Sequence, residues 1–169
     1  MLPIKAASII SVLACLALFT PPASALTDMH GKTANLETLV GQGKWTVVEV
    51  WASDCRACRG SIHHTVDFET ANPDVDVLGI SLDGADGKAN AEKFIDEFGL
   101  DFPNLLSSAS EIDQYLYSTA KESFIGTPTF MLYNPQGKLL AVQPGVVTEE
   151  ELGAFIHKQD AQSQPQPAG

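Results

Sequence analysis

Basic residues and cysteines are both scarce in this sequence of 169 residues. Its 10 Lys and Arg are outnumbered by 21 Asp and Glu, so the formal net charge is −11. Such a surface repels phosphate backbones and anionic lipid, which disfavours nucleic-acid binding and favours a basic protein partner. With 3 cysteines the chain is not a disulfide-stapled mini-protein, and its length indicates one domain.

The N-terminal segment lacks a hydrophobic run long enough for an ordinary membrane span. The uncharged run Ala6–Phe19 is shorter than the roughly 20 residues that cross a bilayer. Lys5 precedes this run, Pro21-Pro22 ends it, and Ala23-Ser24-Ala25 fits the small-x-small pattern of a signal peptidase site. We therefore expect residues 1–25 to be a cleaved signal peptide and the mature protein to be periplasmic.

Two other interpretations of this segment remain open. One is an uncleaved membrane anchor. The other is a lipoprotein signal at Val12–Cys15, which is disfavoured because the apolar run continues past Cys15. If the signal is cleaved, Cys15 leaves with it, and the mature chain keeps only Cys55 and Cys58. A single close pair of cysteines indicates chemistry more than mechanical stapling.

Hydrophobic periodicity and turn residues predict strands that alternate with helices. The predicted strands are 46–51, 75–82, 126–133 and 138–143, and the predicted helices are 55–70, 89–98, part of 112–124, and 149–158. Residues 102–106 are ambiguous, and the Gln- and Pro-rich segment 160–169 is expected to be a disordered tail. This order predicts an α/β fold with a mixed central sheet flanked by helices, the domain covering residues 26–159.

The motif Cys55-Arg56-Ala57-Cys58 lies where a buried strand passes into a helix. Unpaired amides and the helix dipole stabilise a thiolate at such a helix start, so we expect Cys55 to be the nucleophile. Cys58 lies one turn further on and can resolve a mixed disulfide. Arg56 also favours the thiolate, whereas Asp54 opposes it.

Structural roles for the cysteine pair compete with the redox role. A zinc site of four cysteines would need a second pair, which this sequence does not contain. His63 and His64 make a Cys/Cys/His site for copper or zinc conceivable, although adjacent histidines on a helix usually face solvent. A purely structural disulfide is a further alternative, but closing so short a loop contributes little stability. We expect neither a metal nor a cofactor.

Two motifs resemble those of the thioredoxin superfamily. Residues Val48–Cys58 are similar to its strand followed by W-A-x-x-C-x-x-C, and Gly126–Phe130 is similar to its loop with a cis proline beside the cysteines. Over residues 28–158 the chain resembles the exported TlpA/ResA-type members. The resemblance implies a thioredoxin-like fold with an N-terminal extension and a central insertion at residues 81–117.

The resemblance also suggests roles around the cysteine pair. Glu49 occupies the position of a buried acid that could accept the proton of Cys58, the alternative being an exposed edge residue. Glu49 and Trp51 lie two apart and so share one face of their strand. Trp51 is expected to pack under the site and to contribute to substrate binding. Pro128 would leave the backbone of Thr127 to pair with an extended substrate.

These observations predict a periplasmic thiol–disulfide oxidoreductase, monomeric and supplied by a membrane-embedded electron donor. Its substrates would be disulfides of other proteins, for example in cytochrome c maturation, and Arg56 would lie in the binding region. One alternative is a copper chaperone that uses the cysteines and a histidine. Another is a thiol peroxidase, but residues 50–54 do not contain the proline of the Pro-x-x-x-Thr-x-x-Cys pattern.

Overall fold

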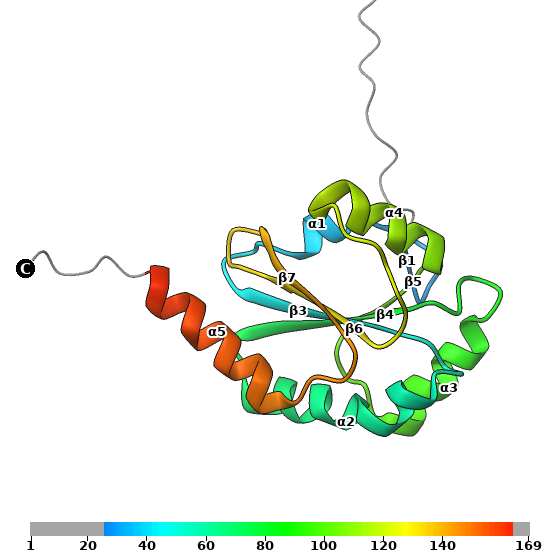
Figure 1. The fold of residues 1–169 in the computed structure, drawn as a ribbon. Helices are drawn as coiled ribbons and strands as arrows, with labels where there is room; N and C mark the ends of the chain where they lie inside the picture. The colour runs from blue at the N-terminus through cyan, green and yellow to red at the C-terminus, as the bar shows by residue number, and fades with distance from the viewer. Residues whose placement is uncertain (1–25, 164–169) are drawn as a thin grey trace, which may run out of the picture.

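The computed structural model describes residues 26–163, in which helices flank a seven-stranded sheet (Figure 1). The expected signal peptide and the last six residues of the expected tail lie outside the described residues. The strands are β1 Leu26–Asp28, β2 Thr33–Ala34, β3 Trp45–Trp51, β4 Val75–Ser81, β5 Asn104–Leu106, β6 Thr129–Tyr133 and β7 Leu139–Pro144. The helices are α1 Leu36–Leu39, α2 Arg56–Ala71, α3 Lys88–Phe98, α4 Ala109–Ala120 and α5 Glu149–Ser163.

The sheet is mixed, as predicted, with strand order β2-β1-β5-β4-β3-β6-β7. Strands β3, β4 and β5 run parallel, while β6 pairs with β3 and β7 with β6 in antiparallel fashion. The short strands β1 and β2 extend the sheet beyond β5. Strand β3 has a neighbour on each side, and all of its residues are buried. Its carboxyl end is therefore a rigid support for the loop that follows.

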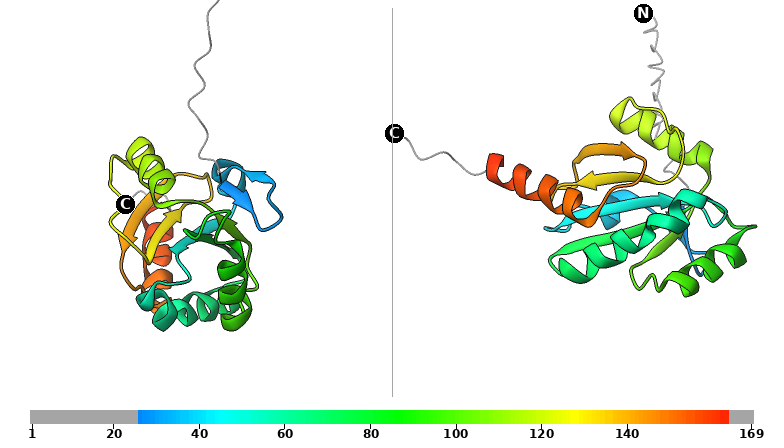
Figure 2. Two further views of the ribbon diagram at one scale, coloured as in Figure 1. Left: turned by 90° about the vertical axis from the view of Figure 1, so that its right-hand side faces the viewer. Right: turned by 60° about the horizontal axis from the view of Figure 1, so that its bottom comes forward.

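Helices cover both faces of the sheet (Figure 1, Figure 2). One face packs against α2, α3 and α5 through a core that includes Trp51, Ile62, Phe94 and Leu152. The other face packs against α1 and α4 through a second core. Successive residues of a strand point to opposite faces, so β3 contributes to both cores.

The strand-to-helix junction after β3 positions the cysteine pair. Helix α2 begins at Arg56 with Cys55 as its N-cap residue. Its buried side chains recur every three or four residues, which gives one buried stripe against the sheet: Cys58, Ser61, Ile62, Thr65 and Phe68. Within residues 26–163, no helix is long and apolar enough to cross a membrane.

Three segments differ from the sequence-based expectation. The ambiguous residues 102–106 contain the strand β5, and residues 26–34 form the hairpin β1–β2, where the sequence analysis predicted no strand. The last helix continues to Ser163, so placing the start of a disordered tail at Asp160 was wrong. The indole of Trp45 donates a hydrogen bond to Asp160 at 2.9 Å and meets the ring of Phe155 edge-on, and these contacts hold the final turns of α5.

Candidate active site

Cys55 and Cys58 form a disulfide, with their Cα atoms 5.3 Å apart. Cys55 is partly exposed, whereas Cys58 is fully buried. The backbone N–H of Cys58 donates to the sulfur of Cys55 at 3.1 Å. The arrangement confirms the expected geometry, in which the first cysteine faces solvent at a helix start and the second lies behind it. A thiolate at Cys55 would receive the same amide hydrogen bond.

Charged residues flank the pair in the pattern that the sequence suggested. Arg56 and Asp54 are both exposed, on either side of Cys55. One turn later, Arg59 forms an ion pair with Glu97, and its guanidinium lies 5.1 Å from the ring centre of Phe98 on α3. Arg56 thus directly follows Cys55 in the chain and is exposed, while Arg59 joins α2 to α3.

The loop before β6 lies against the sulfur of Cys55. The Thr127–Pro128 peptide bond is cis, as the resemblance implied. The carbonyl oxygen of Thr127 is 3.5 Å from the sulfur of Cys55, and Pro128 is buried. The carbonyl of Pro128 in turn accepts the N–H of Gly145 at 2.8 Å, which ties this loop to the loop after β7. Two segments more than 70 residues apart in the chain thereby meet at the exposed sulfur.

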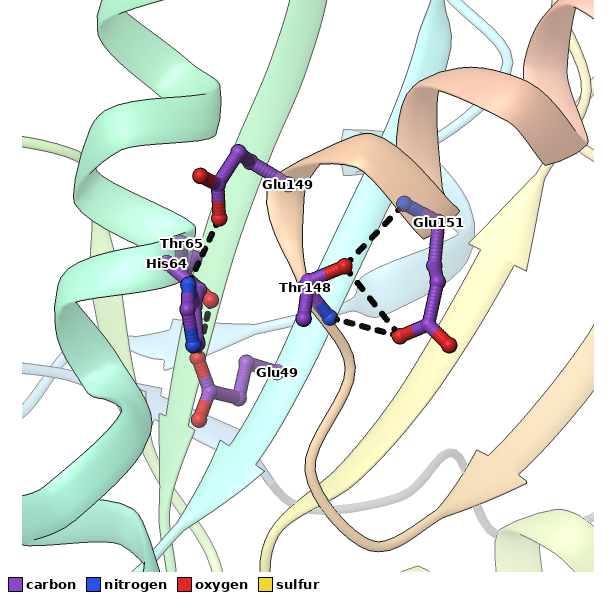
Figure 3. Close-up of polar contacts among 6 residues, drawn as sticks. All are labelled: Glu49, His64, Thr65, Thr148, Glu149 and Glu151. Carbon is purple, nitrogen blue, oxygen red and sulfur yellow. Dashed lines mark hydrogen bonds and ion pairs between the residues drawn. The ribbon is translucent and has the colours of Figure 1, made fainter.

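Glu49 is fully buried on the face of β3 that packs against α2 (Figure 3). One carboxylate oxygen accepts a hydrogen bond from the hydroxyl of Thr65, and the other has no hydrogen-bond partner among the described residues. Burial raises the pKa of Glu49 to about 7, although the Thr65 hydrogen bond opposes the rise. The expected burial is confirmed, and the alternative of an exposed edge residue is wrong.

Glu49 lies on β3, and its hydrogen bond to Thr65 shows which turn of α2 lies beside its carboxylate. This contact constrains how the carboxylate could reach the cysteines. Thr65 lies two turns beyond Cys58, a rise of roughly 10 Å along the helix. A carboxylate bonded to Thr65 therefore does not lie directly beneath Cys58. Its second oxygen has no hydrogen-bond partner among residues 26–163.

Trp51 shares the face of Glu49 but has a packing role. It is fully buried, stacks on Phe94 with ring centres 4.4 Å apart, and donates its indole N–H to the side chain of Asn104 at 3.2 Å. Packing under the site is confirmed. The indole has no exposed surface in this structure, and the expected contact of Trp51 with substrate stays a prediction. The hydrogen bond between Trp51 and Asn104 needs a glycine at position 79, because a Cβ there would lie 1.9 Å from the Asn104 side-chain oxygen.

A contact that sequence reasoning missed holds the loop between β3 and Cys55. Ser53 donates its backbone N–H and its hydroxyl to the two carboxylate oxygens of Asp83, at 3.0 and 2.5 Å. Asp83 follows β4, and β3 and β4 are parallel neighbours, so their carboxyl ends lie at the same edge of the sheet. A signal was present in the order of the elements, because polar residues that directly follow adjacent parallel strands lie at the same edge of the sheet.

Two apolar side chains near the site are unusually exposed. Ile125 is 76% exposed just before Gly126-Thr127-Pro128, and Val146 is 51% exposed directly after Gly145. The hydrogen bond between Gly145 and Pro128 brings their two loops together beside the cysteines. Sequence reasoning missed both residues, although each is a β-branched residue next to a glycine in a loop.

The two histidines of α2 do not form a metal site with the cysteines among residues 26–163. His63 is exposed, and the Nδ1 atom of His64 lies 2.6 Å from Glu149 at the start of α5 (Figure 3). The first turn of α5 is also capped by Thr148, which exchanges hydrogen bonds with Glu151. Throughout residues 26–163, no group of three or more His, Cys, Asp and Glu side chains is arranged to hold a metal ion.

A Cys-x-x-Cys pair at a helix start, beside a cis-proline loop on a thioredoxin-like sheet, defines a thiol–disulfide oxidoreductase. The chain belongs to the AhpC/TSA family, whose model matches residues 20–142. It is similar to the thiol–disulfide oxidoreductase ResA of Bacillus subtilis, with 24% identity over 137 residues that cover 80% of this chain and 72% of the relative. ResA of Halalkalibacterium halodurans is also 24% identical, over 78% of this chain and 70% of the relative.

Solved structures show the same fold. StoA from Bacillus subtilis superposes with a TM-score of 0.60 and 22% identity, covering 80% of this chain and 99% of that chain. A secreted disulfide oxidoreductase of Mycobacterium tuberculosis, described as homologous to Escherichia coli DsbE, gives a TM-score of 0.60 and 21% identity. That match covers 78% of this chain and 92% of the other. The expectation of a thioredoxin-like fold is confirmed.

Proposed function

We propose that the protein is exported to the periplasm and reduces disulfides of other proteins there, acting as a monomer through Cys55 and Cys58. The observation that carries the proposal is the partly exposed Cys55 at a helix N-cap, with its sulfur 3.5 Å from the Thr127 carbonyl oxygen. Export is supported by the signal-like residues 1–25 and by relatives described as a secreted oxidoreductase and an exposed lipoprotein thioredoxin.

The reaction consists of two successive thiol–disulfide exchanges. The Cys55 thiolate attacks one sulfur of the substrate disulfide, and the other substrate sulfur leaves as a thiolate. Cys58 then loses its proton and attacks the sulfur of Cys55, which releases the second substrate thiolate. The substrate gains two electrons, and the protein is left with the Cys55–Cys58 disulfide. A dithiol donor, which we place in the membrane, must reduce this disulfide before the next turnover.

In this mechanism Glu49 accepts the proton that Cys58 loses. Its pKa of about 7 suits a group that takes up and gives back a proton near neutral pH. The free carboxylate oxygen supports transfer through one water molecule, because Thr65 holds the other oxygen two turns away from Cys58.

The substrate would lie across the loop of Thr127 and Pro128. An extended segment can pair with the backbone at Thr127, while the exposed Ile125 and Val146 offer apolar contacts on the same side. Arg56 lies beside the attacked disulfide, and the net charge of −11 favours basic substrates. Apocytochromes with reducible cysteine pairs are one class that fits these features.

Trapping of mixed disulfides tests this assignment. Cys58→Ser should accumulate mixed disulfides with reducible proteins, because nothing resolves them, and Cys55→Ser should trap none. Non-reducing electrophoresis followed by mass spectrometry gives the result. Equal trapping by both variants would show that Cys55 is not the attacking thiol.

The direction of electron flow needs a separate measurement. A reductant should have a Cys55–Cys58 potential near that of thioredoxin, about −270 mV, rather than that of a strong periplasmic oxidase, about −120 mV. Redox equilibration with glutathione or dithiothreitol gives the value. Reduced protein that binds copper tightly but does not reduce insulin would instead support the copper chaperone.

A further inference from the structure

The loop that presents Cys55 is short and is anchored at three points. At its start, the carbonyl of Trp51 accepts the N–H of Leu82 at 2.8 Å. At its end, the N–H of Cys55 donates to the carbonyl of Ala52 at 3.1 Å. The middle of the loop is held through Ser53, whose partner lies on a different loop.

That partner, Asp83, binds Ser53 with one contact to each carboxylate oxygen. The N–H of Ser53 donates to Oδ2 and its hydroxyl to Oδ1. Ser81 donates its own hydroxyl to Oδ2, and the N–H of Asp83 returns a hydrogen bond to Ser81 at 3.2 Å. Hydrogen bonds to an ionised carboxylate are stronger than neutral ones, so this cluster is a firm attachment.

The attachment matters because the geometry of Cys55 decides the stability of its thiolate. Cys55 is the N-cap of α2, and its sulfur receives the N–H of Cys58 at 3.1 Å. A thiolate gains from this amide and from the helix dipole only while the sulfur stays at the cap position. Ser53 lies two residues before Cys55, so loosening Ser53 would loosen the cap.

We propose that Asp83 is a positioning residue that, through Ser53, keeps Cys55 at the helix N-cap and thereby lowers the pKa of its thiol. The proposal rests on the proposed function, in which the Cys55 thiolate is the nucleophile. The negative charge of Asp83 acts in the opposite direction, because a nearby carboxylate disfavours a thiolate. Variants that separate charge from geometry therefore decide between the two effects.

The experiment measures the pKa of Cys55 in the reduced full-length mature protein carrying Cys58→Ser, from thiolate absorbance and from the pH dependence of iodoacetamide alkylation. Asp83→Ala removes both charge and attachment. It should raise the pKa by about one unit and slow alkylation below that pKa about 10-fold. Asp83→Asn keeps an acceptor for Ser53 but removes the charge. The pKa of Cys55 in this variant should therefore be no higher than in the protein with Asp83.

Asp86→Ala is the matched control, since Asp86 is an exposed acid on the same loop. It removes the same charge and should leave the pKa of Cys55 unchanged. A folded Asp83→Ala protein with an unchanged or lowered pKa would overturn the proposal, as would an Asp83→Asn protein with the full rise. If Asp83→Ala does not fold, Ser53→Ala decides, because it removes one of the two contacts: a smaller rise supports the proposal and no rise overturns it.

These measurements involve no substrate, so the two proposals can fail separately. A protein that shows the Asp83 effect but reduces no disulfide contradicts only the proposed function. A protein that traps substrates normally while Asp83→Ala leaves the pKa of Cys55 unchanged contradicts only the positioning role. Lower thermal stability without a change in the pKa of Cys55 would assign Asp83 a purely structural role.

Discussion

The two faces of strand β3 are equally buried, but the two cores that they join contain different polar groups. Toward α2, α3 and α5, β3 presents Glu49 and Trp51. Toward α1 and α4 it presents Val48 and Val50, which join a core that also contains the hydroxyl pair of Tyr115 and Tyr133. Those two hydroxyls are 2.9 Å apart and satisfy each other.

The difference distinguishes a group suited to proton transfer from one suited to structure. Burial raises the pKa of Glu49 into the neutral range, and one of its oxygens has no partner among residues 26–163. Burial also raises the pKa of Tyr133 well above 10, so this phenol stays neutral at ordinary pH. A buried acid that titrates near pH 7 lies on the face of the cysteines, and a paired phenol that does not titrate lies on the other face.

The largest expected effect follows from Glu49→Gln. Removing the proton acceptor should slow resolution of the mixed disulfide about 100-fold while leaving Cys55 reactive. Stopped-flow release of a substrate from the mixed disulfide, measured across pH 5 to 9, reports this step. Thr65→Val is the matched variant: it removes the hydrogen bond that lowers the pKa of Glu49, so the pH midpoint should move upward. Normal turnover by Glu49→Gln at every pH would make Glu49 structural.

The same acid makes folding stability depend on pH. Below pH 4.5 the carboxyl of Glu49 is protonated in both the folded and unfolded states. In this range the protein has its full unfolding free energy, because no charge is buried at Glu49. Between pH 4.5 and about 7 the unfolded state loses its proton first, and about 3 kcal/mol of unfolding free energy is lost. Urea unfolding at a series of pH values should show this fall, and Glu49→Gln should not show it.

A comparable loss of stability, without a proton-transfer effect, is expected from Gly79→Ala. The added Cβ would lie 1.9 Å from the Asn104 oxygen and 2.8 Å from the Trp51 indole nitrogen, so their hydrogen bond must break. We expect a loss of about 3 kcal/mol in urea unfolding from crowding and the unpaired indole. Gly60→Ala is the control, because its Cβ would meet nothing within 4 Å in the middle of α2. It should instead stabilise the protein by about 0.5–1 kcal/mol.

The smallest effect is expected on the other face. Tyr133→Phe removes the hydrogen bond between the hydroxyls of Tyr133 and Tyr115 and should cost about 1 kcal/mol of unfolding free energy. The Cys55–Cys58 potential and the pH profile of resolution should not change. The double variant with Tyr115→Phe should cost less than the sum of the two single variants, because it leaves no orphaned hydroxyl. A shifted potential in Tyr133→Phe would show that the two faces are coupled.

The sequence alone determined the features that depend on local order. A β-branched run followed by Cys55-Arg56-Ala57-Cys58 predicts the first cysteine at a helix start, and the structure has this arrangement. The burial of Glu49 also followed from its apolar neighbours Val48 and Val50. The cis bond before Pro128 followed from the resemblance, carried by a short contiguous motif.

Contacts between distant segments depend on how the strands and helices assemble. Ser53 and Asp83 are 30 residues apart, Trp51 and Asn104 are 53 apart, and Trp45 and Asp160 are 115 apart. Each pair depends on which strands become neighbours in the sheet or which helix packs over its end, and hydrophobic periodicity does not encode those pairings. The class of chemistry could therefore be predicted from a short segment. The contact between Ser53 and Asp83 before Cys55, the full burial of Trp51 and the length of α5 depend on packing.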